Sequence, residues 1–201
     1  MGLIKSIADN FSGYPVFTMR DVELALPGSG KSGIRSILSY MVSKGKLYRV
    51  RSGRYSFSKD SLVSGFAFRP FYYGLLSALT YREMWDQLAK PSILTTNNVR
   101  SAWTEVFGGT RVETHHIPRK YLFGFSDVSY GGITIPVSDP EKTLIDFVYL
   151  RQRASEECYA ALSAASNAEK LESYLKAYDS HTKVAVRNIF ARYSTTLEAK
   201  Y

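Results

Sequence analysis

The sequence predicts an α+β protein of two domains, a small one over residues 1–60 and a larger one over residues 61–201. Helical patterns followed by a hairpin pattern fill the first domain, whereas strand and helix patterns are mixed in the second. Charge is also uneven, because ten basic and four acidic residues give the first domain +6 of the total +8. A basic small domain joined to a near-neutral larger one indicates a polyanionic partner for the first.

Two helices are predicted before residue 30. Apolar residues recur at helical spacing over residues 3–11, until the Ser12–Pro15 stretch breaks the pattern. Thr18 is placed to cap a second helix, because its hydroxyl can accept an unpaired backbone N–H near Asp21. The Pro27–Gly30 stretch ends this second helix.

The third helix, over residues 32–44 with Gly45 as its C-cap, combines an apolar face with a face of small hydroxyls around Arg35. Tyr40 lies at the edge of this polar face. A slim helix of this kind fits a major groove, where Arg35 can reach guanine edges and the serines can bond phosphates or bases. We expect Lys31, just before the helix, to meet a DNA phosphate.

A β-hairpin is predicted next, because residues 47–51 and 54–57 alternate with period two around Ser52-Gly53. Leu47, Arg49 and Arg51 are expected on one strand face. Three helices followed by an arginine-bearing hairpin predict a winged helix-turn-helix that binds double-stranded DNA, with the arginines on phosphates beside the groove. The alternative is a basic face that is only solvated. The expected DNA contacts are Lys31, Ser32, Arg35, Ser36, Ser39, Tyr40, Arg49, Arg51 and Arg54.

Three other motifs give way to simpler interpretations. Ala25–Ser32 fits a permissive phosphate-loop pattern, but Ala25 replaces the first glycine and a helix, not a buried strand, is predicted before it. Residues 1–6 match a bare myristoylation pattern, whose apolar residues are better used to pack the first helix. His115 and His116 are adjacent, so in a strand they point to opposite faces and do not chelate one metal. We therefore expect no catalytic site, cofactor or metal.

Two further observations bear on where in the cell the protein is expected. The single cysteine, Cys158, cannot form an internal disulfide, which fits a reducing cytoplasm. No stretch approaches about 18 uncharged apolar residues, and Lys5 and Asp9 interrupt the N-terminal segment. We expect a cytoplasmic protein with no membrane contact.

The second domain is predicted to begin after the polar Ser58–Ser61 stretch and to combine a small mixed sheet with C-terminal helices. Ser138 is expected to cap a helix over residues 142–151, with Glu141 completing a capping box. Aromatic residues of this domain are expected in its core and at interfaces rather than in a cofactor site. The remaining expected elements are a helix over 69–79 continuing toward Trp85, strands over 92–96, 111–117, 121–128 and 133–137 with a turn at Gly131-Gly132, and two helices striped by Leu171, Leu175 and Tyr178 and by Val186, Ile189, Phe190, Tyr193 and Leu197.

The chain resembles AbiEi-type antitoxins over about residues 3–150. The resemblance lies in the winged helix, the segments 72–79 (YYGLLSAL) and 94–96 (LTT), and above all 137–146 (VSDPEKTLID). Within the resemblance, residues 98–110 are polar and aromatic where the commoner pattern is more basic. It implies a type IV toxin–antitoxin role, in which the first domain represses its own operon and the second counters a nucleotidyltransferase-like toxin.

Two alternatives stay open beside this role. One is a stand-alone winged-helix regulator, whose second domain mediates oligomerisation, such as a homodimer, or binds an effector. The other is an enzyme. A nucleotidyltransferase needs a glycine-serine loop followed by paired aspartates, and Gly124–Asp127 lacks the glycine-serine step and a matched second aspartate.

Overall fold

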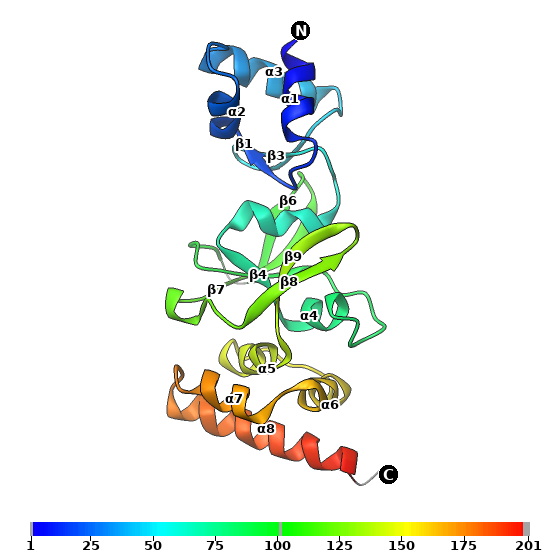
Figure 1. Ribbon diagram of the computed structural model, residues 1–201, viewed down its shortest axis with the longest axis vertical. Coiled ribbons are helices and arrows are strands. Elements are labelled where there is room, and N and C mark those ends of the chain that lie inside the picture. The colour runs from blue at the N-terminus through cyan, green and yellow to red at the C-terminus, as the bar shows by residue number, and fades with distance from the viewer. Residues whose placement is uncertain (1, 101, 199–201) are drawn as a thin grey trace. The chain divides into compact units, whose positions relative to one another are not determined.

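The computed structural model describes residues 2–100 and 102–198 and shows a mixed α+β protein (Figure 1). The chain divides into two compact units. The first comprises the chain up to Arg69 together with Trp103–Val112, and the second comprises Pro70–Ala102 and the chain from Glu113 onward. Segment 1–60, expected as a domain, thus lies within the first unit. Each unit has a hydrophobic core of its own.

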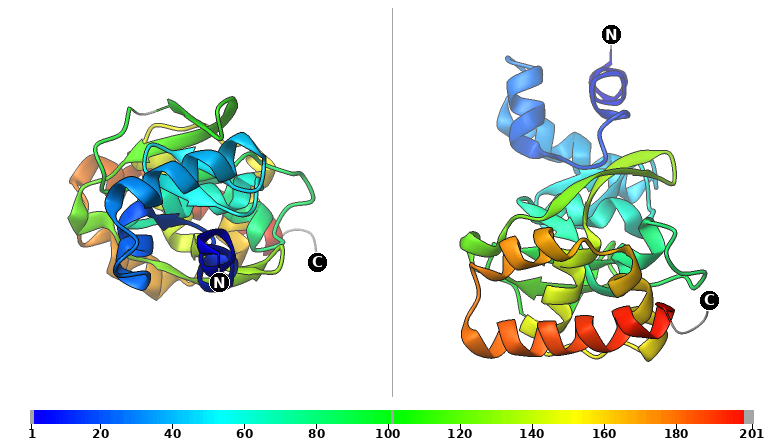
Figure 2. Two further views of the ribbon diagram at one scale, coloured as in Figure 1. Left: turned by 90° about the horizontal axis from the view of Figure 1, so that it is seen from above. Right: turned by 60° about the horizontal axis from the view of Figure 1, so that its bottom comes forward.

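Three helices and a three-stranded antiparallel sheet of order β1-β3-β2 build the first unit. The predictions of the three helices and the hairpin are confirmed within one or two residues. The elements are α1 (Leu3–Phe11), β1 (Phe17–Thr18), α2 (Met19–Ala25), α3 (Lys31–Ser43), β2 (Tyr48–Arg51) and β3 (Arg54–Ser56). In the left view of Figure 2, which is seen from above, α1, α2 and α3 are the blue helices nearest the viewer.

Local contacts explain where these helices begin and end. Thr18 caps α2 as predicted, since its hydroxyl accepts the Asp21 N–H at 3.2 Å while the Asp21 carboxylate accepts the Thr18 N–H at 2.7 Å. The predicted C-cap of α3 is corrected by one residue, because Lys44 is the cap and Gly45 follows it in the left-handed region at φ +65°. Only glycine adopts this conformation without strain, so Gly45 turns the chain from α3 toward β2.

Leu47 and Arg49, expected on one strand face, lie in different environments. Leu47 and Val50 are both buried at 1% exposure, although they are three residues apart, while Arg49 is exposed. The strand pairing shifts register between Arg49 and Arg51, which marks an irregularity of the β-bulge type. Leu47 lies before the first residue of β2 and packs into the core of the unit, so it does not share the environment of Arg49, and the irregularity after Arg49 adds a local break in the two-residue period.

An eight-residue 3-10 helix that the sequence patterns did not reveal, η1 (Ser61–Phe68), follows the hairpin. The Asp60 carboxylate caps it by accepting the Leu62 N–H at 2.8 Å. Phe68 is fully buried and lies under the Arg51 guanidinium, 4.4 Å from carbon to ring centre. This stacking draws one of the hairpin arginines toward the body of the unit.

The predicted small mixed sheet is confirmed as six strands in the order β6-β7-β5-β4-β9-β8. Parallel pairs join β4 to β9 and β5 to β7, whereas β4 to β5 and β8 to β9 are antiparallel. The strands are β4 (Phe71–Tyr73), β5 (Ser92–Thr95), β6 (Ala102–Val106), β7 (Thr110–His116), β8 (Phe125–Tyr130) and β9 (Ile133–Ser138). The turn predicted at Gly131-Gly132 is confirmed, with Tyr130 paired to Ile133.

Two predicted elements of the second unit are corrected. The helix expected over 69–79 is a strand, β4, followed by the short α4 (Leu75–Tyr81), because the aromatic run 71–73 pairs along β5. The strand expected over 121–128 is a 3-10 turn, η2 (Arg119–Tyr121), followed by β8, since Gly124 at φ +72° turns the chain between them. Strand β6 was not predicted.

Helix α5 (Pro140–Tyr149) begins earlier than predicted, and its N-cap is Asp139 rather than Ser138. The Asp139 carboxylate accepts the Lys142 N–H at 2.9 Å, and Pro140 occupies the first turn, where its missing N–H costs nothing. The Ser138 hydroxyl instead lies 2.7 Å from the Thr143 hydroxyl.

Helices α6 (Glu156–Ala165), α7 (Ala168–Leu175) and α8 (Ser180–Glu198) complete the second unit. Figure 1 shows α5 between the sheet and the layer that these three helices form. Helix α6 was not predicted. Tyr178 lies just after α7, and the side chain of Leu197, expected in the last stripe, lies outside the described residues. Over the described chain, every helix is too short or too polar to cross a membrane.

Candidate nucleic-acid interface

Helix α3 presents the polar face that the sequence predicts. Ile34, Leu38 and Met41 point into the core of the first unit, with at most 1% of each side chain exposed. The burial of this stripe leaves the opposite side of the helix to solvent. All six predicted contact residues on or beside it are exposed: Lys31, Ser32, Arg35, Ser36, Ser39 and Tyr40.

The turn before α3 has the geometry of a helix–helix connection. Helix α2 ends just before it, with the Leu26 N–H donating to the Val22 carbonyl at 2.9 Å. Gly30, at φ +64°, then starts α3 and accepts the Ile34 N–H at 3.1 Å. A phosphate loop needs a buried strand in front of it, and a helix stands there instead.

The hairpin arginines divide into different environments. Arg49 is exposed, 6.0 Å from carbon to the ring centre of Tyr55, while Arg51 is partly covered above Phe68. Burial and then the charge of Arg54 lower the pKa of Arg51. Arg51 and Arg54 are paired in register across the hairpin, and like charges placed opposite each other destabilise a sheet. An anion between them would relieve this repulsion.

Charge along the sequence of this region is of one sign. Between Glu23 and Asp60 the sequence has no acidic residue and eight basic ones. The carboxylate of Asp60 is already engaged in capping η1. The eight basic residues are Lys31, Arg35, Lys44, Lys46, Arg49, Arg51, Arg54 and Lys59. Such an excess of basic residues gives the region a positive potential that attracts polyanions.

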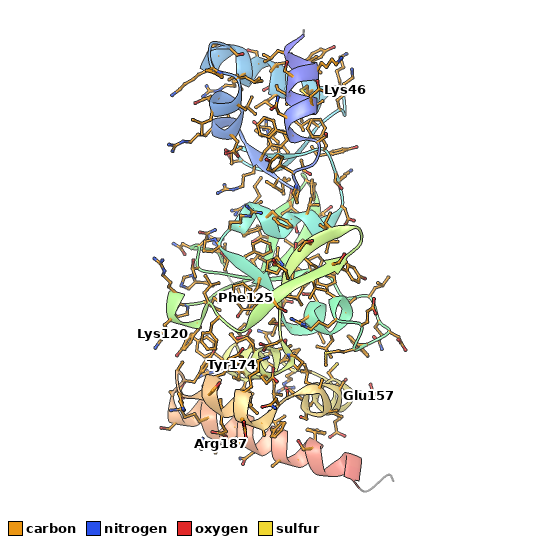
Figure 3. All side chains as sticks on the ribbon, viewed as in Figure 1. Lys46, Lys120, Phe125, Glu157, Tyr174 and Arg187 are labelled. Atoms are coloured by element: carbon orange, nitrogen blue, oxygen red, sulfur yellow. The ribbon has the colours of Figure 1, made fainter. Side chains whose placement is uncertain are left out.

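Three of these basic residues were not among the predicted contacts. Lys44, Lys46 and Lys59 are all exposed, and Figure 3 shows Lys46 at the surface of the first unit. The Lys44 ammonium lies 5.9 Å from the ring centre of Tyr40. The signal that could have found them is their position in the same acid-free stretch as the predicted residues.

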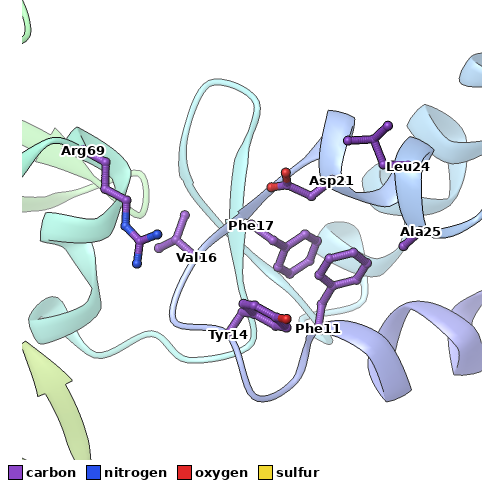
Figure 4. Close-up of a pocket in the computed structure, with 8 residues that line it drawn as sticks. All are labelled: Phe11, Tyr14, Val16, Phe17, Asp21, Leu24, Ala25 and Arg69. Carbon is purple, nitrogen blue, oxygen red and sulfur yellow. The ribbon is translucent and has the colours of Figure 1, made fainter.

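The first unit also has a pocket of 490 Å³, drawn in Figure 4. Its walls come from the end of α1, the loop to β1, helix α2 and Arg69, which extends toward Val16 in the close-up. Two exposed apolar side chains, Tyr14 and Leu24, line it. These walls are distinct from the polar face of α3.

A buried ionic cluster lies in the second unit. The ammonium of Lys142 contacts the Asp146 carboxylate and donates to the Tyr72 hydroxyl at 2.7 Å, and that hydroxyl donates to Asp146 at 2.8 Å. All three side chains are fully buried. Burial lowers the pKa of Lys142 and raises that of Asp146, while their mutual attraction opposes both shifts. These buried, hydrogen-bonded charges hold α5 against β4. They are not accessible to a large ligand.

A second polar cluster joins β5 to β7. Glu113 lies between two partners: it accepts from the Ser92 hydroxyl, and its other oxygen lies 2.8 Å from the Nε2 atom of His115. Burial raises the pKa of Glu113, but the hydrogen bonds from His115 and Ser92 outweigh it and leave the pKa below its usual value. A nucleophilic serine needs the imidazole beside it, whereas here the carboxylate separates the two. His116 is exposed, and its Nδ1 lies 3.0 Å from the Asn97 carbonyl.

Comparison with protein-family models gives no match, and comparison with curated protein sequences gives none either. Among solved structures, the chain is similar to the crystal structure of the RV2827C protein from Mycobacterium tuberculosis. The similarity has a TM-score of 0.64 at 14% identity and covers 94% of this chain and 76% of that one. At this identity the similarity shows a shared fold and no more.

Proposed function

We propose that this protein is a sequence-specific DNA-binding regulator of transcription that acts in the cytoplasm. In this proposal the first unit is a winged helix-turn-helix, with α3 as the recognition helix and the β2–β3 hairpin as the wing. The observation that carries the proposal is the exposed face of α3, where small hydroxyls surround Arg35 within a stretch that has eight basic and no acidic residues.

Each part of this surface would have its own role. Arg35 projects from the first half of α3, where a recognition helix meets base edges, and its fork of donors matches the two acceptors of guanine. Ser32, Ser36 and Ser39 are short enough to let the helix enter the groove and can bond bases or phosphates. Arg49 is exposed and would bind phosphate groups of the DNA backbone, whatever the base sequence.

Selection of bound fragments from random duplexes, at a stated salt concentration, tests this proposal. We expect wild-type protein to enrich one motif, and Arg35→Ala to cost about 1–3 kcal/mol of discrimination at one position of that motif. Lys176→Ala, an exposed change at the end of α7 in the second unit, is the matched control and should bind like wild type. Enrichment of no motif by wild type, or the same motif with equal discrimination from Arg35→Ala, would refute the assignment.

The second unit is proposed to serve as the partner domain of an antitoxin. Support comes from the resemblance of segment 137–146 to AbiEi-type antitoxins. Within this segment, Lys142 and Asp146 lie buried in α5, so a partner would bind other residues of the unit. A neighbouring gene for a nucleotidyltransferase-like protein, whose toxicity this chain relieves on co-expression, is the expected finding. An isolated gene would favour the alternative, a stand-alone regulator that uses this unit to form a homodimer or bind an effector. We assign the chain no catalytic activity.

A further inference from the structure

A second hairpin of the first unit lies against the edge of the β2–β3 hairpin. Strands β6 and β7 are joined by a turn at Phe107–Gly109, and residues 103–112 belong to the first unit. The Phe107 N–H donates to the Val50 carbonyl at 3.1 Å. Because β2 is the edge strand of its sheet, this bond covers an edge and fixes the turn beside the proposed wing.

The turn, the wing and the end of α3 line an open groove of 350 Å³. Its floor includes Leu47, which is 1% exposed, and one wall is formed by the half-buried Phe107. Two basic residues, Arg49 and Lys59, line it and are both exposed. The other lining residues are Val42, Gly45, Tyr48 and Gly108, so no carboxylate contributes to its walls.

The backbone of the turn allows close approach. Phe107, Gly108 and Gly109 all have positive φ, at 55°, 68° and 156°. A Cβ placed on Gly108 would meet no atom within 4 Å, so the space above this turn is open. Because glycine has no side chain, a ligand can come within contact distance of the backbone of such a turn. Phosphate groups bind backbone N–H groups of loops in this way.

We propose that this groove seats the phosphodiester backbone of the DNA duplex bound by α3, so that the β6–β7 turn acts as a second wing. The inference rests on the proposed function and extends it to Lys59 and to residues 107–110. Arg49 and Lys59 meet one strand of phosphates from one side, and the glycine turn meets it from the other. An extended polyanion fits this arrangement because the groove is open and cationic, whereas a small apolar ligand would need an enclosed apolar cavity.

A charge introduced on the β6–β7 hairpin tests whether a phosphate strand lies in the groove. The residue after the turn, Thr110, is exposed at the start of β7. A glutamate there would repel a phosphate strand, whereas a glutamine has the same size and no charge. Thr110→Glu and Thr110→Gln are therefore a matched pair. Lys59→Ala tests the opposite side of the groove, with Lys176→Ala as its control for the loss of one exposed lysine.

The experiment measures affinity for the selected duplex by fluorescence anisotropy over a salt series. Lys59→Ala should weaken binding about five- to tenfold at 0.1 M salt and lower the salt slope by about one, because each phosphate contact contributes roughly 0.9 to that slope. Thr110→Glu should weaken binding by a similar factor, with both controls within twofold of wild type.

Outcomes separate the inference from the function on which it rests. If Arg49→Ala weakens binding while Lys59→Ala and Thr110→Glu bind like their controls, DNA binding stands and the second wing is refuted. If Thr110→Glu and Thr110→Gln weaken binding equally, charge is not the cause and the inference is also overturned. If the wild-type chain binds no duplex at any salt concentration, the proposed function fails, and the inference with it.

Discussion

Replacing Lys142 by methionine should reveal how much the buried ionic cluster contributes to the second unit. Lys142 and Asp146 are both fully buried, and once the ammonium is removed, the Asp146 carboxylate keeps the hydrogen bond from the Tyr72 hydroxyl, at 2.8 Å, but no cation beside it among the described residues. An uncompensated buried charge costs about 3–5 kcal/mol. For a chain of 201 residues this corresponds to a fall in Tm of roughly 6–20 °C.

The double variant Lys142→Met/Asp146→Leu separates lost charge pairing from lost packing. With both charges gone, the Tyr72 hydroxyl is the polar group left unpaired, at a cost of about 1–3 kcal/mol. The double variant should therefore be more stable than Lys142→Met alone. In the single variant, the unpaired Asp146 has a raised folded-state pKa, so the destabilisation is largest at neutral pH and shrinks as pH falls and the carboxyl takes up a proton.

Urea unfolding provides the assay, with Trp85 as the fluorescent reporter because it packs against the core of the second unit. A Trp103→Phe background removes the other tryptophan, which belongs to the first unit. Midpoints at pH 7 and pH 5 for wild type, single and double variants complete the cycle. A single variant as stable as wild type, or a double variant no more stable than the single, would refute the account of the cluster.

Two further predictions concern charged side chains with distinct surroundings. Arg51→Ala should weaken DNA binding less than Arg49→Ala and lower stability by about 0.5–2 kcal/mol, because Arg51 stacks on Phe68; anisotropy and thermal melting check this, and equal losses of affinity would contradict it. The pKa of Glu113 is lowered in the folded state, so its stabilisation is present above the unfolded pKa of about 4.5 and is lost as pH falls through the folded value. Glu113→Gln should flatten the decline of Tm below pH 5, and a decline as steep as in wild type would contradict the role of this carboxylate.

Much of the first unit could be predicted because its elements depend on local signals. The Thr18 cap, the apolar stripe of α3 and the turn at Ser52-Gly53 each act within a few residues. The run 71–73 is different, since an apolar stretch this short fits a helix or a strand equally well. Its strand form depends on pairing with residues 93–95, which lie far along the chain.

The N-cap of α5 could have been predicted with one more local rule. Ser138 and Asp139 are both good caps, but a proline favours the first helical position and an extended residue before it. Pro140 therefore selects Asp139, whose ψ of 169° is extended. The proline thus outweighs the capping-box pattern at Ser138.

Candidate contact residues on α3 followed from periodicity, because burying one face of a helix exposes the other. The environment of Arg51 could not be predicted, since it depends on Phe68 in η1. The place of Lys59 depends in the same way on the β6–β7 turn, which comes from residues more than 40 positions later. Contacts of this kind are tertiary and leave no pattern within either segment.

The salt dependence of duplex binding tests the central claim most directly. If α3 and the wing bind DNA with at least four phosphate contacts, the logarithm of the association constant should fall with the logarithm of salt concentration with a slope of about −3.6 or steeper. The double variant Arg35→Ala/Arg49→Ala should reduce that slope by about one, because Arg49 is the proposed phosphate contact of the pair and Arg35 the proposed base contact. A slope near zero for the wild-type chain, or a double variant with an unchanged slope, would contradict DNA binding through this surface.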